Sequence, residues 1–313
     1  MNSDPKISVI IPTHCRPVLV ATAVNSALAQ TYRNIEIIVV IDGCDPETFK
    51  ILRDLGDSRL IVLETGKQGG AQRARNFGID KASGAYIALL DDDDEWFPEK
   101  LETQFRKLIS TDFQRPIVVS KFVRVSEHGR MEWPHEIYEG REHFSEYIMG
   151  RKGFLAGVQI IQTSTILAPT SLFRDVRFDI ELRKFQDWDW LLRASALEGV
   201  GIEFVKQPLS LFNAPQNRTS ISTRELDWRS SVLWAESLEN LVSRKAFASF
   251  LLIDIGAMAA TKGDWKAFIY ILERALGTKV SSLQNLLVYI SYWLLSPNLL
   301  SVLRRLARRV QNL

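Results

Sequence analysis

The sequence predicts an α/β fold: a mostly parallel, Rossmann-like sheet with helices on both faces, followed by a helical C-terminal region. Two observations lead to this prediction. In the first 125 residues, short apolar runs alternate with segments whose apolar residues recur at helical spacing. Strands covered on both faces in a parallel sheet are almost continuously apolar, as these runs are. Beyond residue 223, the recognisable segments all have helical spacing.

The expected elements of the first part alternate in a regular order. Each strand is a short run rich in valine, isoleucine and leucine, and each helix is a longer segment with one apolar side. The expected strands are 6–11, 35–41, 60–63, 85–90 and 117–125. The expected helices are 17–30, 46–55, 72–81 and 98–109. Because crossovers between parallel strands are right-handed, the carboxyl ends of these strands should meet at one edge of the sheet.

The pattern is less regular from 126 to 222 and helical after that. Strands are expected at 163–167 and 202–205, a glycine-containing basic loop at 150–157, and a helix at 186–197. Further helices are expected at 231–241, 246–261, 265–276 and 283–295. We therefore predict a first domain over 1–222, with halves 1–125 and 126–222, and a helical region over 223–313.

Polar residues follow three of the expected strands. Pro12-Thr13-His14 follows the first, Asp42-Gly43-Cys44-Asp45 the second, and Asp91–Asp94 the fourth. Ligands of open α/β sheets bind along the edge formed by the carboxyl ends of the strands. We expect these three clusters, distant in the sequence, to converge in one cleft.

The run Asp91–Asp94, with Glu95 after it, predicts a cation site. Five adjacent carboxylates repel one another, so a cation is their natural partner. Hard oxygen ligands without a nearby histidine or cysteine favour Mg²⁺ or Mn²⁺, which keeps waters and binds the phosphates of a substrate. The alternative is a solvated turn, which is the commoner role of such a run in isolation.

Composition narrows the classes of function. The chain has 313 residues, 46% hydrophobic and 24% charged, which is ordinary for a soluble globular protein. A net charge of +2 gives no general case for nucleic acid as a partner. Cys15 and Cys44 cannot form a disulfide framework or a metal site alone, so we expect reduced thiols in the cytoplasm. We expect no signal peptide and no transmembrane helix, because the longest nearly uncharged apolar stretch, 286–295, falls short of the ~20 residues that span a bilayer.

Residues 297–313 predict a basic amphipathic helix. Leucines and a valine form one stripe at helical spacing, four arginines fall off that stripe, and no acid is present. Such a helix can lie on an anionic membrane surface, which would hold the protein at the inner face of the plasma membrane. The alternative is a helix packed on the protein with its arginines in solvent.

Taken together, the motifs resemble those of the family 2 glycosyltransferases, which have the GT-A fold. The matching segments, in order, are Ile7–Thr13, Ile35–Gly43, Gly69–Gly78, Leu89–Asp94 and Gln186–Trp190. The resemblance covers residues 6 to about 190 and leaves out the helical tail. It implies inverting, metal-dependent transfer of a sugar from a nucleotide-diphosphate sugar, with a UDP-sugar as the expected donor. The acceptor would be a hydroxyl of a glycan, a lipid-linked sugar or a protein in cell-surface glycan synthesis.

The resemblance also implies roles for particular residues near the nucleotide. Pro12, Thr13 and Asp42 would contact the nucleobase and ribose region. Arg75 and Asn76 would hold the nucleotide or order their own loop.

The acidic residues would carry the chemistry. Asp91 and Asp92 would lie against the nucleotide sugar, Asp93 would bind Mg²⁺ or Mn²⁺, and Asp94 would support them. Asp187 would be the catalytic base, although an acid near a helix start can also serve only as a cap.

The sequence departs from the family pattern at several positions. Gln186 replaces the common acid before the base, and Asp92 stands where a small residue is frequent. The stretch 211–220 lacks the histidine of an Arg-x-His element. Trp188 and Trp190 are candidates for an acceptor platform or for the core.

Two other functions compete with sugar transfer. A sugar-phosphate nucleotidyltransferase of similar fold would need a glycine-rich turn after the first strand, and residues 12–16 contain no glycine. A catalytically inactive scaffold would be expected to have lost Asp93 or Asp187, and both are present.

Overall fold

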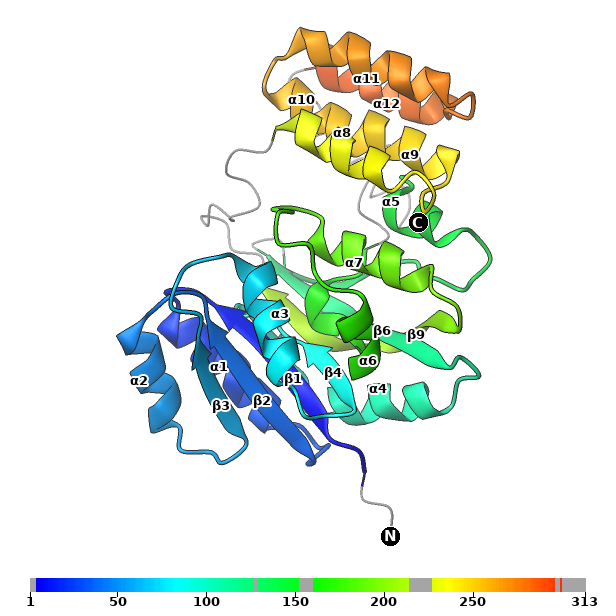
Figure 1. Ribbon diagram of the computed structural model, residues 1–313. Helices are drawn as coiled ribbons and strands as arrows, with labels where there is room; N and C mark the ends of the chain where they lie inside the picture. Colours follow the sequence, from blue (N-terminus) through cyan, green and yellow to red (C-terminus); the bar gives the residue numbers. More distant parts are fainter. Residues whose placement is uncertain (1–3, 127–128, 152–159, 214–226, 296–298, 300–313) are drawn as a thin grey trace. The chain divides into compact units, whose positions relative to one another are not determined.

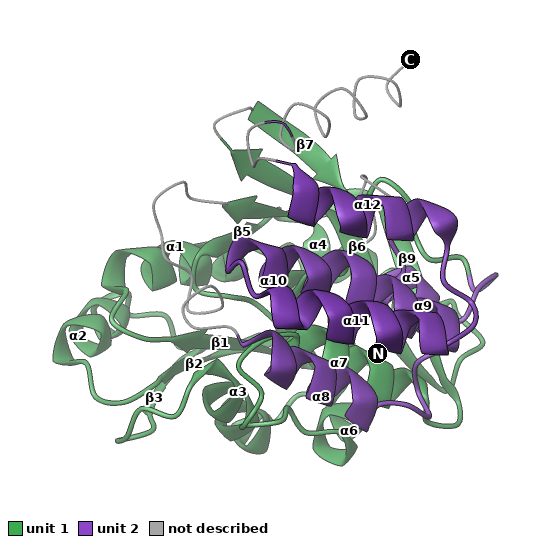
Figure 2. Ribbon diagram, turned by 90° about the horizontal axis from the view of Figure 1, so that it is seen from above, with its two compact units in different colours: residues 1–139, 161–218 green, residues 140–160, 219–313 purple. Residues whose placement is uncertain are grey.

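The computed structural model describes residues 4–126, 129–151, 160–213, 227–295 and 299. The chain forms two compact units, shown in separate colours in Figure 2. Unit 1 comprises residues 1–139 and 161–218, and unit 2 comprises residues 140–160 and 219–313. The segment 140–160, which we expected within the first domain, therefore belongs with the C-terminal helices.

Unit 1 is built on one mixed sheet with the strand order β3-β2-β1-β4-β8-β6-β9-β5, and β7 pairs with β6. Figure 1 labels β1, β2, β3, β4, β6 and β9 of this sheet. The strands are β1 (Ile7–Thr13), β2 (Ile35–Ile41), β3 (Leu60–Glu64), β4 (Tyr86–Leu89), β5 (Asp94–Trp96), β6 (Arg115–Ser126), β7 (Gly129–Trp133), β8 (Leu167–Pro169) and β9 (Val200–Asn213). The helices of this unit are α1 (Pro17–Leu28), α2 (Pro46–Asp54), α3 (Ala71–Lys81), α4 (Lys100–Ile109), α6 (Thr170–Asp175) and α7 (Gln186–Ser195). The predicted α/β fold with a helical C-terminal region is confirmed.

Parallel pairing is concentrated in the N-terminal half of the sheet. β1 pairs in parallel with β2 and β4, and β2 pairs in parallel with β3. The register of β1 and β2 runs from Ile7 opposite Ile35 to Thr13 opposite Ile41, so both strands end at the same level. β8 then lies antiparallel to both β4 and β6, and β6 pairs in parallel with β9. The carboxyl ends of β1, β2, β3 and β4 therefore lie at one edge of the sheet, as predicted.

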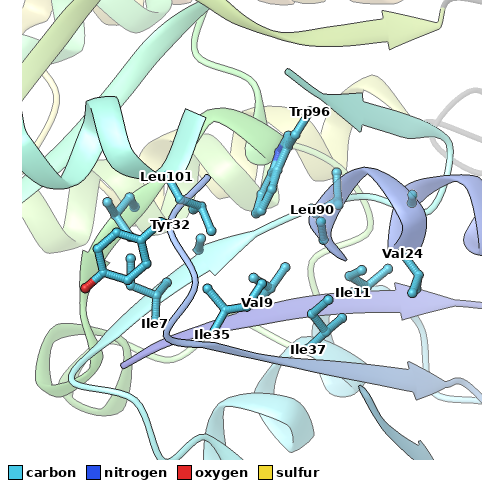
Figure 3. Close-up of a cluster of buried hydrophobic side chains, with 14 of the residues drawn as sticks. Ile7, Val9, Ile11, Val24, Tyr32, Ile35, Ile37, Leu90, Trp96 and Leu101 are labelled. Carbon is cyan, nitrogen blue, oxygen red and sulfur yellow. The ribbon is translucent and has the colours of Figure 1, made fainter. Parts of the chain in front are cut away.

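One face of this sheet packs against α1 and α4. Figure 3 shows that Ile7, Val9 and Ile11 of β1 point into a cluster with Val24 of α1 and Leu101 of α4. These side chains are fully buried. Alternate residues of a strand face opposite sides of the sheet, which is why the odd-numbered residues of β1 share this cluster. The continuous apolar run of β1 in the sequence thus reflects burial of this strand on both faces of the sheet.

The opposite face of the sheet lies against α3. Gly78 of α3 approaches β1 and β2 so closely that an added Cβ would stand 2.8 Å from Cγ2 of Ile10 and 3.2 Å from Cγ2 of Val40. A side chain at this position would push the helix away from the sheet. Because α3 also carries Arg75 and Asn76, the absence of a side chain at Gly78 sets the position of those residues.

A buried carboxylate closes the end of the sheet opposite the site. Glu36, the one polar residue of β2, accepts hydrogen bonds from Ser8 Oγ at 2.5 Å and from Ser83 N at 2.7 Å. Gly84 N also donates to Glu36 Oε1, at 3.2 Å. Burial opposes ionisation of this carboxyl group, but the hydrogen bonds outweigh it and lower the pKa of Glu36. The turn before β4 is therefore fastened to β1 and β2.

Unit 2 consists of helices. They are α5 (Phe144–Met149), α8 (Trp228–Ser237), α9 (Arg244–Phe250), the π-helix η3 (Leu251–Ile255), α10 (Gly256–Thr261), α11 (Trp265–Gly277) and α12 (Leu283–Leu294). The segment 140–160 joins this unit through Arg151, whose backbone N–H donates to Ser249 Oγ at 2.7 Å. Among the helices of the described segments, none combines the length and the apolar character needed to cross a bilayer.

Some predicted elements differ from the structure. The expected strand 163–167 is a 3₁₀ helix, η2 (Thr163–Thr165), followed by the short strand β8. β9 is much longer than the expected strand 202–205. The expected helix 246–261 contains the π-helix η3 between α9 and α10. Most of the expected loop 150–157 and of the expected basic helix 297–313 lies outside the described residues.

The close approach of α3 gives a test of the packing. We expect Gly78→Val to lower the free energy of unfolding by about 1–3 kcal/mol, because added methyl groups overpack the contact with the sheet. Gly277→Val, at a helical glycine with no atom within 4 Å of a built Cβ, is the matched control and should change stability by less than about 0.5 kcal/mol. Urea unfolding measures both, and equal effects would contradict this account.

Candidate functional site

The three polar clusters predicted to converge do meet at the carboxyl edge of β1, β2 and β4. Thr13 Oγ1 donates a hydrogen bond to Asp92 Oδ2 at 2.8 Å, which links the end of β1 to the loop after β4. His14 Nδ1 lies 2.7 Å from the carbonyl oxygen of Asp42, which links the first loop to the end of β2. Pro12 is buried in β1 opposite Val40. The parallel register brings these residues together because β1 and β2 end at the same level and the loop after β4 passes beside the end of β1.

The Asp42 carboxylate organises the loop between β3 and α3. Its oxygens accept hydrogen bonds from the backbone N–H groups of Gly69 and Gly70, each at 2.8 Å. Asp42 is only 4% exposed. The residue thus fastens the start of α3 to the end of β2, whatever contact it makes with a ligand.

Arg75 joins the acid cluster to the start of α7. Its Nη2 donates to Asp91 Oδ1 at 2.6 Å and its Nη1 donates to Gln186 Oε1 at 3.1 Å. The guanidinium carbon lies 5.6 Å from the centre of the Phe178 ring. Arg75 is buried, so one cation connects three segments that are distant in the sequence.

Asn76, the neighbour of Arg75, is engaged with the backbone of Phe178. Its Nδ2 donates to the Phe178 carbonyl oxygen at 2.8 Å, and the Phe178 N–H donates to its Oδ1 at 3.1 Å. Both ends of the amide therefore hold the segment that supplies the ring beside Arg75. The segment that Asn76 orders here is that of Phe178, not its own loop, and the two roles expected for Asn76 stay predictions.

The four aspartates lie in different surroundings. Asp92 is buried, and burial raises the pKa of its carboxyl group, although Arg16 and Thr13 oppose this effect. Arg16 Nη1 donates to Asp92 Oδ1 at 2.9 Å and to Asp93 Oδ2 at 3.1 Å. The side chains of Asp91 and Asp93 are 27% and 28% exposed, so these two carboxylates face solvent.

Asp94 is directed inward and supports the loop from below. Ser164 Oγ donates to Asp94 Oδ2 at 2.6 Å, and the same oxygen accepts from Gln162. The Asp91 N–H in turn donates to Ser164 Oγ at 3.0 Å. Burial raises the pKa of Asp94 well above its usual range. η2 thereby fixes the backbone that presents Asp91.

Asp187 stands at the first turn of α7. Its Oδ1 accepts from the Trp188 N–H at 3.0 Å. Enclosure of the carboxylate raises the pKa of Asp187 to about 6, while the Arg75 charge opposes and the Asp91 charge adds to this shift. A carboxylate with a pKa near 6 is ionised at neutral pH and can still accept a proton.

The neighbouring residues of α7 have structural roles. Asp189 is paired with Arg193 one turn along the helix, and Arg193 also bonds the Arg177 carbonyl oxygen at 2.8 Å. Trp190 is fully buried, stacks on Phe173 with ring centres 4.4 Å apart, and belongs to the core. Trp188 is buried as well, with 7% exposure.

The donor set fits a hard divalent cation. Asp91 and Asp93 offer partly exposed carboxylate oxygens from one short loop. Within the described part of the chain, no group of three or more acidic, histidine or cysteine side chains is arranged to hold a metal ion. Mg²⁺ commonly binds through one or two carboxylates together with waters and substrate phosphates, so a complete protein cage is not required.

Sequence reasoning missed several residues that complete the site. Arg16, Gln162, Ser164 and Phe178 contact the predicted residues directly. Arg16 could have been noticed as a basic residue in the turn after the first strand. The other three come from segments whose place in the sheet depends on antiparallel pairing of β8, which no local pattern indicated.

Several known proteins resemble this chain, two of them along most of its length and one over about a third of it. An Erwinia amylovora amylovoran biosynthesis glycosyltransferase, AmsB, is 28% identical over 77% of this chain and 80% of its own. The Escherichia coli UDP-Glc:α-D-GlcNAc-diphosphoundecaprenol β-1,3-glucosyltransferase WfaP is 42% identical over 31% of this chain and 39% of its own. The crystal structure of S. aureus TarS 1–349 has a TM-score of 0.65, with 16% identity over 92% of this chain and 90% of that one. This likeness confirms the predicted GT-A fold.

The family model supplies the assignment. The model described as "Glycosyl transferase family 2" matches residues 8–174, which is more than half of the chain. This range contains all of β1 except its first residue, the acid cluster, α3 with Arg75, and η2. The chain therefore belongs to glycosyl transferase family 2.

Proposed function

We propose that this glycosyltransferase is inverting and metal-dependent, and that it moves a sugar from a UDP-sugar to an acceptor hydroxyl in cell-surface glycan synthesis. The observation that carries the proposal is the position of Arg75, which bonds Asp91 of the acid cluster and Gln186, the residue before Asp187. Asp187 is close enough for the charges of Arg75 and Asp91 to influence its pKa. Transfer needs a place for the diphosphate and a separate base, and these two groups of acids meet both needs. We assign the chemistry to unit 1, which lies within the first predicted domain, 1–222, and an accessory role to unit 2, which contains the helical region 223–313.

In this reaction the two groups of acids have different tasks. An acceptor oxygen attacks the anomeric carbon, the bond from that carbon to the diphosphate oxygen breaks, and the acceptor proton passes to Asp187. Attack from the side opposite the leaving group inverts the anomeric centre. A divalent cation held by Asp93, with Asp91 beside it, would neutralise charge on the departing diphosphate. Arg75 keeps Asp91 and α7 in fixed relative positions.

The expected nucleotide contacts are part of the same proposal. Thr13 and Asp42 lie at the ends of β1 and β2, where a nucleobase and ribose would bind across the sheet edge. Support for a UDP-sugar comes from the names of similar proteins: WfaP uses UDP-Glc, and TarS was crystallised with UDP-GlcNAc. Support for a glycan or lipid-linked acceptor comes from AmsB and WfaP in the same way.

Two alternatives give different results in one experiment. The purified protein is incubated with UDP-, GDP- and dTDP-sugars, with and without Mg²⁺ or Mn²⁺, and nucleoside diphosphate release is measured. We expect release from one UDP-sugar that depends on metal. Pyrophosphate exchange would indicate a nucleotidyltransferase, and neither turnover nor thermal stabilisation by UDP would indicate a scaffold.

The base assignment predicts a large loss of rate. Asp187→Asn should lower kcat by about 10²–10⁴-fold, because general-base catalysis contributes about that much, while UDP binding is kept. In the wild type, kcat should fall as the pH drops through about 6, since the carboxylate of Asp187 must be ionised to accept a proton.

Asp175→Asn is the matched control for this substitution. Asp175 is an exposed carboxylate of unit 1 paired with Arg115 at 2.6 Å, so its loss should leave kcat unchanged. Retention by Asp187→Asn of more than about a tenth of the wild-type rate would exclude Asp187 as the base.

We also propose a cytoplasmic protein held peripherally at the inner face of the plasma membrane. The helix that first indicated this, 297–313, lies outside the described residues, but α11 and α12 support the idea independently. Both helices carry exposed apolar side chains, here together called the α11–α12 surface: Trp265, Ile269, Leu276, Leu283, Leu287, Ile290 and Leu294. No acidic residue follows Glu273 in the sequence, whereas six basic residues do. Exposed apolar side chains in a basic stretch of sequence match an anionic bilayer.

Vesicle binding tests the α11–α12 surface. The full-length protein should sediment with phosphatidylglycerol vesicles more than with phosphatidylcholine vesicles, and Leu287→Lys, at a 60% exposed residue, should weaken this binding. Leu233→Lys, at a 65% exposed residue of α8, is the matched control. Absence of vesicle binding, or a dimer in solution that Leu287→Lys dissociates, would exclude the membrane assignment.

A further inference from the structure

Arg16 lies between two of the acids on which the proposed function depends. It is the residue immediately before α1, in the turn that follows β1. A single nitrogen, Nη1, contacts Asp92 Oδ1 at 2.9 Å and Asp93 Oδ2 at 3.1 Å. One positive centre thus bridges two carboxylates, which is also what a divalent cation does between neighbouring acids.

The contact with Asp93 is the one that matters for a metal. Asp93 is the residue expected to bind the cation, and its side chain is 28% exposed. The guanidinium already occupies Oδ2 of that carboxylate. An arginine remains positively charged throughout the working pH range, so it cannot release the oxygen by losing a proton. A metal that approaches Asp93 therefore competes with a positive charge that is already paired with this carboxylate.

The surroundings of Arg16 let it move without being lost from the site. Its side chain is 30% exposed, whereas that of Arg75 is 7% exposed and is held by two partners. The contact with Asp92 is anchored on the far side, because Thr13 Oγ1 holds the other oxygen of Asp92 at 2.8 Å. Arg16 can thus leave Asp93 while Asp92 keeps it at the mouth of the site.

We propose that Arg16 neutralises Asp93 in the metal-free protein and transfers to the donor diphosphate when a divalent cation binds. This inference rests on the proposed function and assigns Arg16 as a positioning residue for the leaving group. Guanidinium groups bind phosphate oxygens in two-pronged geometry and are less strongly hydrated than ammonium groups, which suits such a transfer. The guanidinium charge then stabilises the acids in the metal-free protein and the diphosphate in the metal-bound protein.

The two roles have opposite consequences for binding. In metal-free protein Arg16 competes with the cation, so Arg16→Gln should bind Mn²⁺ alone about two- to fivefold more tightly, as expected for removal of a partly exposed ion pair. With Mn²⁺ saturating, Arg16→Gln should bind UDP about tenfold more weakly, because a charge-assisted hydrogen bond to phosphate is lost. A merely structural arginine would shift both affinities in the same direction.

Calorimetric titration of the full chain measures both constants, Mn²⁺ without nucleotide and then UDP at saturating Mn²⁺. Arg59→Gln is the matched control, because Arg59 pairs with Asp57 at 2.8 Å with similar exposure and lies at the start of β3. Both constants should be unchanged in that variant. Arg16→Lys, which keeps the charge but not the two-pronged geometry, should leave the Mn²⁺ affinity near the wild-type value and still weaken UDP binding.

Three results would overturn the proposal, and they can be told apart. Equal or weaker Mn²⁺ binding by Arg16→Gln would exclude competition at Asp93. Unchanged UDP binding would exclude transfer to the diphosphate. A wild-type protein that binds neither Mn²⁺ nor UDP would overturn the proposed function together with this inference, whereas the first two results leave the proposed function intact.

Discussion

The parallel pairing of β1 with β2 and β4 is the constraint on which the rest of the site depends. These strands have almost no polar side chains. β1 and β2 end at the same level, and β4 ends opposite Ile10, so that the loop after β4 passes beside the end of β1. Each loop that leaves this edge carries the residues that interrupt the apolar runs. Thr13, Asp42 and Asp92 are neighbours because of backbone register, before any of their own hydrogen bonds are considered.

The four aspartates at this edge repel one another, and three features of the structure reduce this repulsion. Four adjacent aspartates cannot all remain ionised and unpaired in a small volume. Arg16 bridges Asp92 and Asp93, and Arg75 pairs with Asp91. Asp94 is turned into the protein, where burial raises the pKa of its carboxyl group. The four aspartates therefore differ in their surroundings, although they are identical residues in the sequence.

The strands and helices in the N-terminal half of unit 1 were predictable from the sequence, because each of them has its own local pattern of apolar residues. Continuous apolar runs and helical spacing gave β1 to β4 and α1 to α4 with ends within a few residues, and the order of the strands gave the convergence of Thr13, Asp42 and Asp91–Asp94. Arg75 and Asp187 were found through the family resemblance, and the structure places both beside the acid cluster, while their roles stay proposals.

What the sequence did not predict depends on contacts between distant segments. The 3₁₀ helix η2 looks like a strand in its residue pattern, but Ser164 turns there to reach Asp94 and the Asp91 backbone. Segment 140–160 has no pattern that separates it from its neighbours, and its place in unit 2 comes from bonds such as that of Arg151 to Ser249. Nothing in the sequence around Arg16 separates it from an ordinary surface arginine. Only its contacts with Asp92 and Asp93 distinguish it.

Gly78 shows that the site is shaped by a missing group as well as by those present. It lies one turn beyond Arg75 on α3, and its lack of a side chain lets the helix rest directly on Ile10 and Val40. The distance from helix axis to sheet decides how far the guanidinium reaches over the strand ends. A residue with no functional group thereby sets the reach of the cation that connects Asp91 to α7. Substitution of Gly78 would therefore change binding and turnover as well as folding.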